Sequence, residues 1–116
     1  MGTHAVLGVK MADGSITACY VHYDGNTMRP RIERFLNEQT TTCLAMLITE
    51  SQSFGGMRSF HCPNYQDPMQ IHYTEFLDDD EIYAIDETNF YEEDHYGARI
   101  WYLVDYETED IIKRTR

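Results

Sequence analysis

Several features that would define a function class are missing from this 116-residue sequence. No run of about 18 apolar residues could span a bilayer, and the opening stretch MGTHAVLGVK lacks the apolar region of a signal peptide. The three cysteines, Cys19, Cys43 and Cys62, are odd in number and form no CxxC pair. We therefore expect a cytoplasmic protein with reduced thiols, no membrane association and no disulfide.

Signatures of catalysis and of metal binding are also missing. The sequence contains no GxSxG, P-loop, GxGxxG or HExxH motif. His61-Cys62 matches no zinc-ligand spacing, and the run Asp78-Asp79-Asp80-Glu81 lacks the alternating spacing of an EF-hand loop. His22 and Asp24 stand near a predicted strand end without an identifiable base or nucleophile partner. The sequence thus predicts no catalytic residue, no metal site, no cofactor and no enzyme.

Lysine and arginine are absent from residues 60–97, which we call the acidic segment. Eleven of the 20 acidic residues lie there, so 20 − 11 = 9 acids remain outside, together with all 9 basic residues. The rest of the chain is formally neutral, and the net charge of −11 belongs to this one segment.

Aromatic residues are interleaved with the carboxylates of the acidic segment, and this pattern is unlike a disordered acidic tail. Along a strand, side chains on one face repeat at about 6.6 Å, close to the spacing of phosphates in a nucleic-acid strand. Such a surface repels nucleic acid and attracts the basic groove of a protein that binds it. The predicted partner-binding residues are Glu75, Asp78, Asp79, Asp80, Glu81, Tyr83, Asp86, Glu87, Phe90, Tyr91, Glu92, Glu93, Asp94 and Tyr96.

The length suits one domain over residues 1–116, and the order of predicted elements favours an α+β fold. Strands are expected over residues 5–10 and 16–23, joined by a turn at 12–15, and over residues 100–106 and 111–113. Apolar and polar residues alternate weakly over residues 69–76, which favours a further strand there. Residues 81–85 fit a strand or a helical turn equally well. We expect a small antiparallel sheet, made of the N-terminal hairpin and the C-terminal strands, with two helices.

Two helices are expected between these pairs of strands. Thr27 can cap the first helix, which carries Pro30 in its first turn and repeats Met28, Ile32 and Phe35 at helical spacing. The second helix is expected over residues 43–50.

The stretch GVKMADGSITACYVHYDGN, residues 8–26, resembles a family of small bacteriophage proteins that carry a pattern close to Y-C-H-W-D-G-Y. Tyr20, His22, Asp24 and Gly25 match that pattern, while Tyr23 replaces the usual Trp and Asn26 the usual Tyr. The resemblance implies a phage origin, an accessory role in an infected bacterial host, and no particular reaction. The acidic segment lies outside it.

Three functions stay open on the sequence. The first is inhibition of a host protein that handles nucleic acid, such as a CRISPR effector, a restriction enzyme or a polymerase, by an acidic surface that imitates nucleic acid and does not itself bind it. The second is a small-molecule or nucleotide-sequestering pocket near Tyr20, His22 and Asp24. Its anionic ligand would meet a helix N-terminus and nearby arginines, namely Arg29, Arg31 and Arg34. The third is an interaction subunit that its acidic face keeps soluble.

Overall fold

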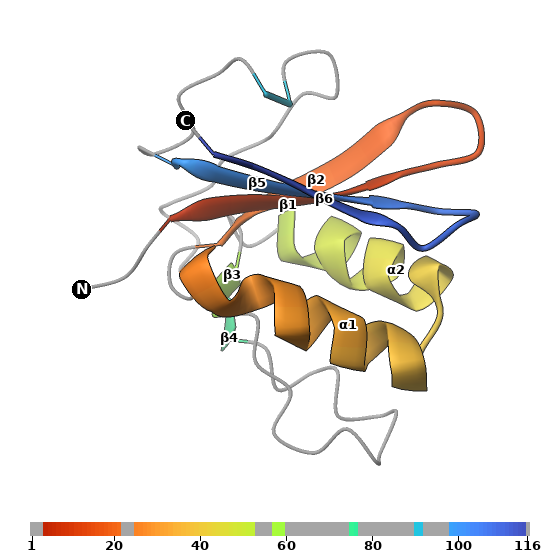
Figure 1. The fold of residues 1–116 in the computed structure, drawn as a ribbon, viewed down its shortest axis with the longest axis horizontal. Coiled ribbons are helices and arrows are strands. Elements are labelled where there is room, and N and C mark those ends of the chain that lie inside the picture. The colour runs from red at the N-terminus through yellow and green to blue at the C-terminus, as the bar shows by residue number, and fades with distance from the viewer. Residues whose placement is uncertain are drawn as a thin grey trace.

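The computed structural model describes residues 4–21, 25–52, 57–59, 75–76, 90–91 and 98–115. Two helices and six strands lie in these ranges (Figure 1). The strands are β1 (Ala5–Lys10), β2 (Ile16–Val21), β3 (Met57–Ser59), β4 (Glu75–Phe76), β5 (Ile100–Asp105) and β6 (Ile111–Thr115). The helices are α1 (Met28–Glu38), which follows a 3₁₀ turn at Gly25–Thr27, and α2 (Thr41–Gln52).

All six strands join one mixed sheet in the order β4-β3-β2-β1-β5-β6. The predicted α+β class, the N-terminal hairpin β1–β2 and the C-terminal hairpin β5–β6 are confirmed. Most of the sheet is antiparallel, but β2 and β3 pair in parallel through Val21 and Met57, and β1 and β5 pair in parallel, with Ala5 opposite Ile100 and Lys10 opposite Asp105. The β1–β5 pair is parallel because Val21, at the end of β2, and Ile100, at the start of β5, both lie opposite Ala5, so the chain between the two hairpins leaves and re-enters the sheet at the same end.

The element boundaries agree with the sequence pattern except at a few places. Thr27 occupies the N-cap position of α1 as predicted, but its side chain makes no capping hydrogen bond, and α2 is longer than expected. The short strand β3 was not predicted, because three residues are too few to show alternation. Of the predicted strand at 69–76 only β4 is described, while residues 69–74 and 81–85 lie outside the described part.

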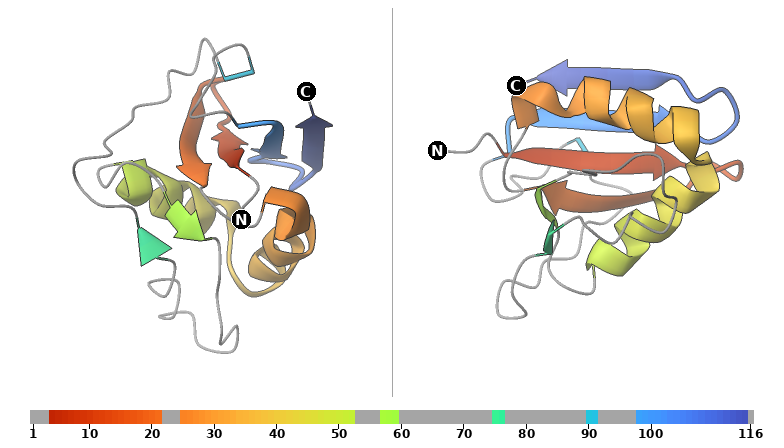
Figure 2. Two further views of the ribbon diagram at one scale, coloured as in Figure 1. Left: turned by 90° about the vertical axis from the view of Figure 1, so that its left-hand side faces the viewer. Right: turned by 90° about the horizontal axis from the view of Figure 1, so that it is seen from below.

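Both helices lie on the same face of the sheet (Figures 1 and 2). The core on this side combines alternate residues of β1, β2 and β5 with the apolar faces of α1 and α2. This core includes Leu7 of β1, Cys19 of β2 and Tyr102 of β5. It also includes Ile32 of α1 and Ile48 of α2. Because side chains alternate along a strand, the neighbouring residues of the same strands point to the opposite side.

Polar side chains close both hairpins. In the β1–β2 turn the Asp13 carboxylate accepts hydrogen bonds from the Ser15 amide and hydroxyl, at 2.9 and 2.7 Å, and Gly14 supplies a φ of +89°. In the β5–β6 turn the Asp105 carboxylate accepts hydrogen bonds from the amides of Glu107 and Thr108, at 2.9 and 3.0 Å. These bonds lower the pKa of both carboxyl groups.

Candidate interaction surface

Most of the predicted partner-binding residues lie outside the described residues. Three of the predicted partner-binding residues are among the described residues. They are Glu75, whose backbone belongs to β4, and the adjacent pair Phe90 and Tyr91. The other eleven, which are outside, are Asp78, Asp79, Asp80, Glu81, Tyr83, Asp86, Glu87, Glu92, Glu93, Asp94 and Tyr96. Among the described residues, the candidate surface consists of the points at which the acidic segment meets the sheet.

The face of the sheet away from the helices, which we call the second face, carries its own buried cluster. Val6, Tyr20, Trp101 and Leu103 come from its central strands, and Phe90 of the acidic segment packs on them. Phe90 is only 2% exposed, and its ring lies directly over the backbone of Gly8. A Cβ built on Gly8 would lie 2.6 Å from Cε1 of Phe90, which is closer than nonbonded carbon atoms approach. The absence of a side chain at Gly8 therefore creates the space that the Phe90 ring fills.

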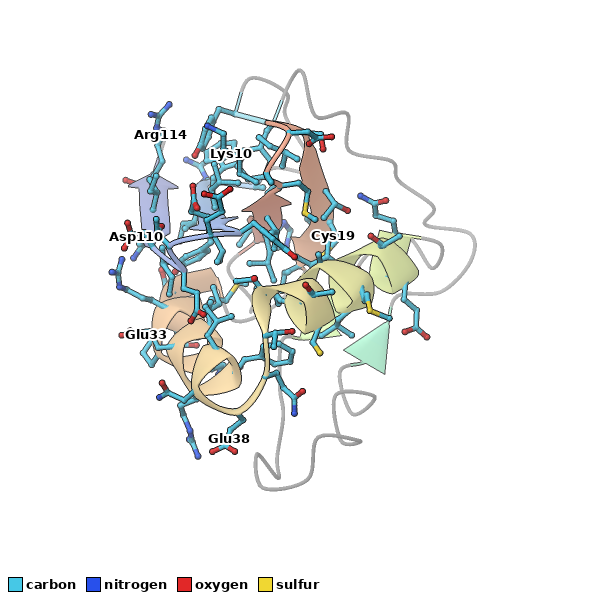
Figure 3. All side chains as sticks on the ribbon, turned by 90° about the vertical axis from the view of Figure 1, so that its right-hand side faces the viewer. Lys10, Cys19, Glu33, Glu38, Asp110 and Arg114 are labelled. Carbon is cyan, nitrogen blue, oxygen red and sulfur yellow. The ribbon has the colours of Figure 1, made fainter. Side chains whose placement is uncertain are left out.

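Tyr91 continues this contact toward the edge of the sheet. Its ring packs edge-on against Phe90, with 4.7 Å between the ring centroids, and lies 6.5 Å from Trp101. The guanidinium carbon of Arg114, on β6, lies 4.2 Å from the centroid of the Tyr91 ring, which is a cation–π geometry. Burial raises the pKa of the Tyr91 hydroxyl, and the charge of Arg114 opposes that rise. Arg114 is on the side of the sheet away from the helices (Figure 3).

The packing of Phe90 corrects one expectation. Its ring belongs to the protein's own core, so it is not an exposed anchor for a partner. Instead it attaches the acidic segment to the sheet. Phe76, which immediately precedes residues 77–89, belongs to β4 at one edge of the sheet. Phe90, which immediately follows residues 77–89, packs on the second face.

The described residues give no support to a ligand pocket near Tyr20. Tyr20 is 2% exposed, belongs to the second-face cluster and packs edge-on against His4 at 5.6 Å between ring centroids. His22 and Asp24 lie outside the described residues. Arg29 already donates a hydrogen bond from Nη1 to the Ile111 carbonyl at 3.2 Å and pairs with Glu33 at 3.8 Å.

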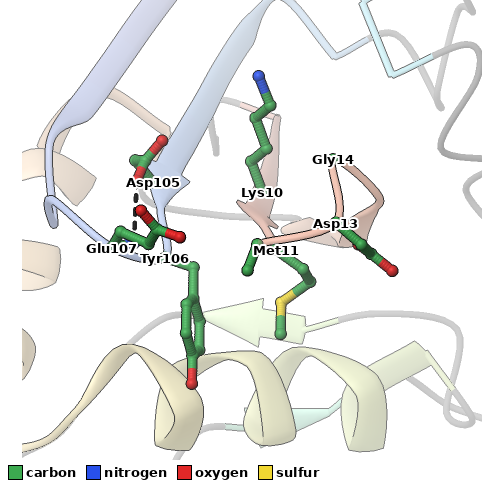
Figure 4. A pocket seen from close by; sticks show the side chains of 8 residues that line it. Lys10, Met11, Asp13, Gly14, Asp105, Tyr106 and Glu107 are labelled. Carbon is green, nitrogen blue, oxygen red and sulfur yellow. Dashed lines mark hydrogen bonds between the residues drawn. The ribbon is translucent and has the colours of Figure 1, made fainter.

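A cavity of about 360 Å³ lies between the two hairpin turns (Figure 4). Its lining includes Lys10, Met11 and Tyr106, together with the carboxylates of Asp13 and Asp105. Both carboxylates accept hydrogen bonds from their own turns, and the Tyr106 hydroxyl is 3.1 Å from the hydroxyl of Thr42. These groups therefore hold the ends of the hairpins, and their arrangement favours no particular ligand.

The two described cysteines differ in accessibility. Cys19 is buried in the core beneath the helices, and burial raises the pKa of its thiol from 9.0 to about 12, while Cys43 is partly exposed on α2. Within the described ranges no group of three or more His, Cys, Asp or Glu side chains is placed to hold a metal ion. No helix among these residues has the length and hydropathy needed to cross a membrane.

In comparisons with known proteins, no protein-family model, curated protein sequence or solved structure matches the chain. The contacts that attach the acidic segment therefore have to be judged on their own chemistry. Sequence reasoning missed the roles of Gly8 and Arg114. Alternation along β1 places Gly8 on the second face, but nothing in the sequence pairs it with a residue 82 positions later.

Proposed function

We propose that this chain is an accessory protein, of bacteriophage type, that inhibits a host protein acting on nucleic acid. Its acidic segment would occupy the basic groove of that protein and imitate the charge of a nucleic-acid strand. The partner is a basic, nucleic-acid-binding protein of the bacterial cytoplasm, and the chain itself binds no DNA or RNA.

One observation carries this proposal: the segment that holds the whole net charge is attached to the folded sheet. Phe90 fills the space above Gly8, and Tyr91 packs against Phe90 and Arg114. A segment that served only to keep the protein soluble would need no buried aromatic contact with the core. An inhibitor gains from such a contact, because a segment that is held at Phe90 and Tyr91 before binding loses less conformational entropy on binding.

The charge distribution supports the same partner. Outside the acidic segment the 9 acids and 9 basic residues cancel, so attraction to a basic groove has one source. Exposed charge attraction is screened over a Debye length of about 8 Å at physiological ionic strength. Complex formation should therefore weaken steeply with added salt, mainly through slower association.

The test uses the immobilised protein to capture partners from a bacterial lysate at low salt, with elution by double-stranded DNA. A partner of the proposed kind is released by DNA, binds DNA by itself, and loses that binding when this protein is added. The triple substitution Asp78→Asn, Asp79→Asn and Asp80→Asn removes three charges from the acidic segment and should slow association.

A matched control removes three charges from the exposed β5–β6 turn by Glu107→Gln, Glu109→Gln and Asp110→Asn. If the two triple variants associate equally fast, net charge alone matters and the acidic segment has no special role. If captured proteins resist both salt and DNA, mimicry of nucleic acid is wrong.

A further inference from the structure

Strand β6 forms an edge of the sheet, with only β5 beside it among the residues that the structure describes (Figures 1 and 2). Lys113, Arg114 and Thr115 are exposed, and Ile112 exposes 52% of its surface. An edge strand offers unpaired N–H and C=O groups to another extended chain, which is how strand addition works. The hydrogen-bond pattern of the β5–β6 hairpin shows which groups of β6 are available.

That pattern starts at the turn, where the Asp105 amide donates to the Asp110 carbonyl at 2.9 Å. In an antiparallel ladder, bonded and non-bonded residue pairs alternate. With Val104 opposite Ile111 and Tyr102 opposite Lys113, the pairs of Ile111, Lys113 and Thr115 are the non-bonded ones. The backbone N–H and C=O groups of these three residues therefore point away from β5.

The helix layer already covers the first of these outward groups. Arg29 of α1 donates a hydrogen bond to the Ile111 carbonyl at 3.2 Å. The outward groups of Lys113 and Thr115 remain at the open part of the edge. An added strand would therefore pair along residues 112–115 and stop where Arg29 begins.

The positive charges of Lys113 and Arg114 on this edge favour an acidic partner. If two copies paired antiparallel about Lys113, its ammonium group would face the same group of the second copy, and like charges directly opposite are destabilising. Carboxylates opposite Lys113 and Arg114 would be favourable, and Ile112, next to Leu103, offers an apolar contact on the same face as Arg114. We propose that the β6 edge binds an extended acidic segment of a partner protein by antiparallel strand addition. The β6 residues that would pair lie outside the acidic segment in the sequence, with Arg114 also in contact with Tyr91 of that segment, and the proposal does not depend on the function proposed above.

The test titrates the full-length ¹⁵N-labelled protein with the capped peptide Thr-Glu-Glu-Val-Thr, whose glutamates would face Arg114 and Lys113 and whose valine would face Ile112. The amide signals of Lys113 and Thr115 should shift more than those of Ile112 and Arg114, because only the first two point outward. Lys113→Glu should weaken binding about threefold to tenfold. Lys10→Glu makes the same charge change at the only other lysine of the chain and should leave binding unchanged.

A peptide with lysine in place of both glutamates is the control for charge. The proposal is overturned if the acidic peptide causes no shifts at millimolar concentration, if the lysine peptide binds as well, or if the shifts do not alternate along β6. Equal affinities for the Lys113→Glu and Lys10→Glu variants would also overturn it.

Discussion

Replacing Gly8 by alanine tests the contact that attaches the acidic segment to the sheet. The new Cβ would lie 2.6 Å from Cε1 and 3.0 Å from Cζ of Phe90, and 3.1 Å from Cγ2 of Ile16. The Phe90 ring must then shift away from Gly8. Overfilling a packed core costs about 1–3 kcal/mol, whereas Gly→Ala by itself favours a strand by about 0.4–1 kcal/mol through the unfolded chain. We expect a net loss of about 1–2 kcal/mol of unfolding free energy.

The assay is urea unfolding followed by the fluorescence of Trp101, the only tryptophan, which is 2% exposed and packs in the same cluster as Phe90. A loss of this size also lowers the melting temperature by roughly 4 to 8 °C. Phe90→Leu shortens the side chain that the new methyl group meets. In a double-mutant cycle, Gly8→Ala should therefore cost at least about 1 kcal/mol less in the Phe90→Leu background than in the wild type.

Gly14→Ala is the matched control, because it also adds one methyl group to a glycine of the same hairpin. Apart from the adjacent residues of the chain, no atom of the described residues lies within 4 Å of that added Cβ, but the residue has a φ of +89°. Its cost, about 1 kcal/mol, comes from backbone conformation and should not change in the Phe90→Leu background. The reasoning fails if Gly8→Ala leaves stability unchanged in the wild type, or if its cost is the same with leucine at position 90.

Further predictions concern three side chains, those of Cys19, Asp105 and Arg114. The raised pKa of the Cys19 thiol, about 12 against an ordinary 9.0, should make it react with a thiol reagent far more slowly than Cys43 in the native protein, and unfolding should abolish the difference. Burial of the uncharged thiol also contributes stability that is present below pH 9 and is lost as the pH rises toward 12, a loss that Cys19→Ala should remove from the pH profile of unfolding. Asp105→Ala should lower stability at neutral pH but not at acid pH, because the lowered pKa of this carboxyl contributes stability that disappears as the pH falls below 3.8; equal losses at both pH values would contradict this. Arg114→Ala should cost about 0.5–1 kcal/mol in urea unfolding and raise the pKa of Tyr91 further, as followed by the NMR shifts of its ring, and an unchanged pKa would show that the guanidinium does not act on that ring.

Local patterns in the sequence determined the elements of the fold. Alternating apolar residues and the Asp13-Gly14 turn predicted the first hairpin, and the spacing of Met28, Ile32 and Phe35 predicted α1 with the face that it buries. These features depend on contacts between residues near each other in the chain, so a window of ten to twenty residues contains them. The confinement of the net charge to residues 60–97 is likewise a property of the sequence alone.

Only the tertiary structure decided which distant residues meet. The parallel pairing of β1 with β5 depends on the chain re-entering the sheet at the end where β2 left it, and local alternation is the same for parallel and antiparallel neighbours. The contact of Phe90 with Gly8 shows this for the candidate surface: in the sequence, Phe90 is one aromatic residue among many carboxylates. Its burial depends on Gly8 of β1, because the ring can occupy that space only where no Cβ is present, and no local sequence pattern predicts the contact between the two residues.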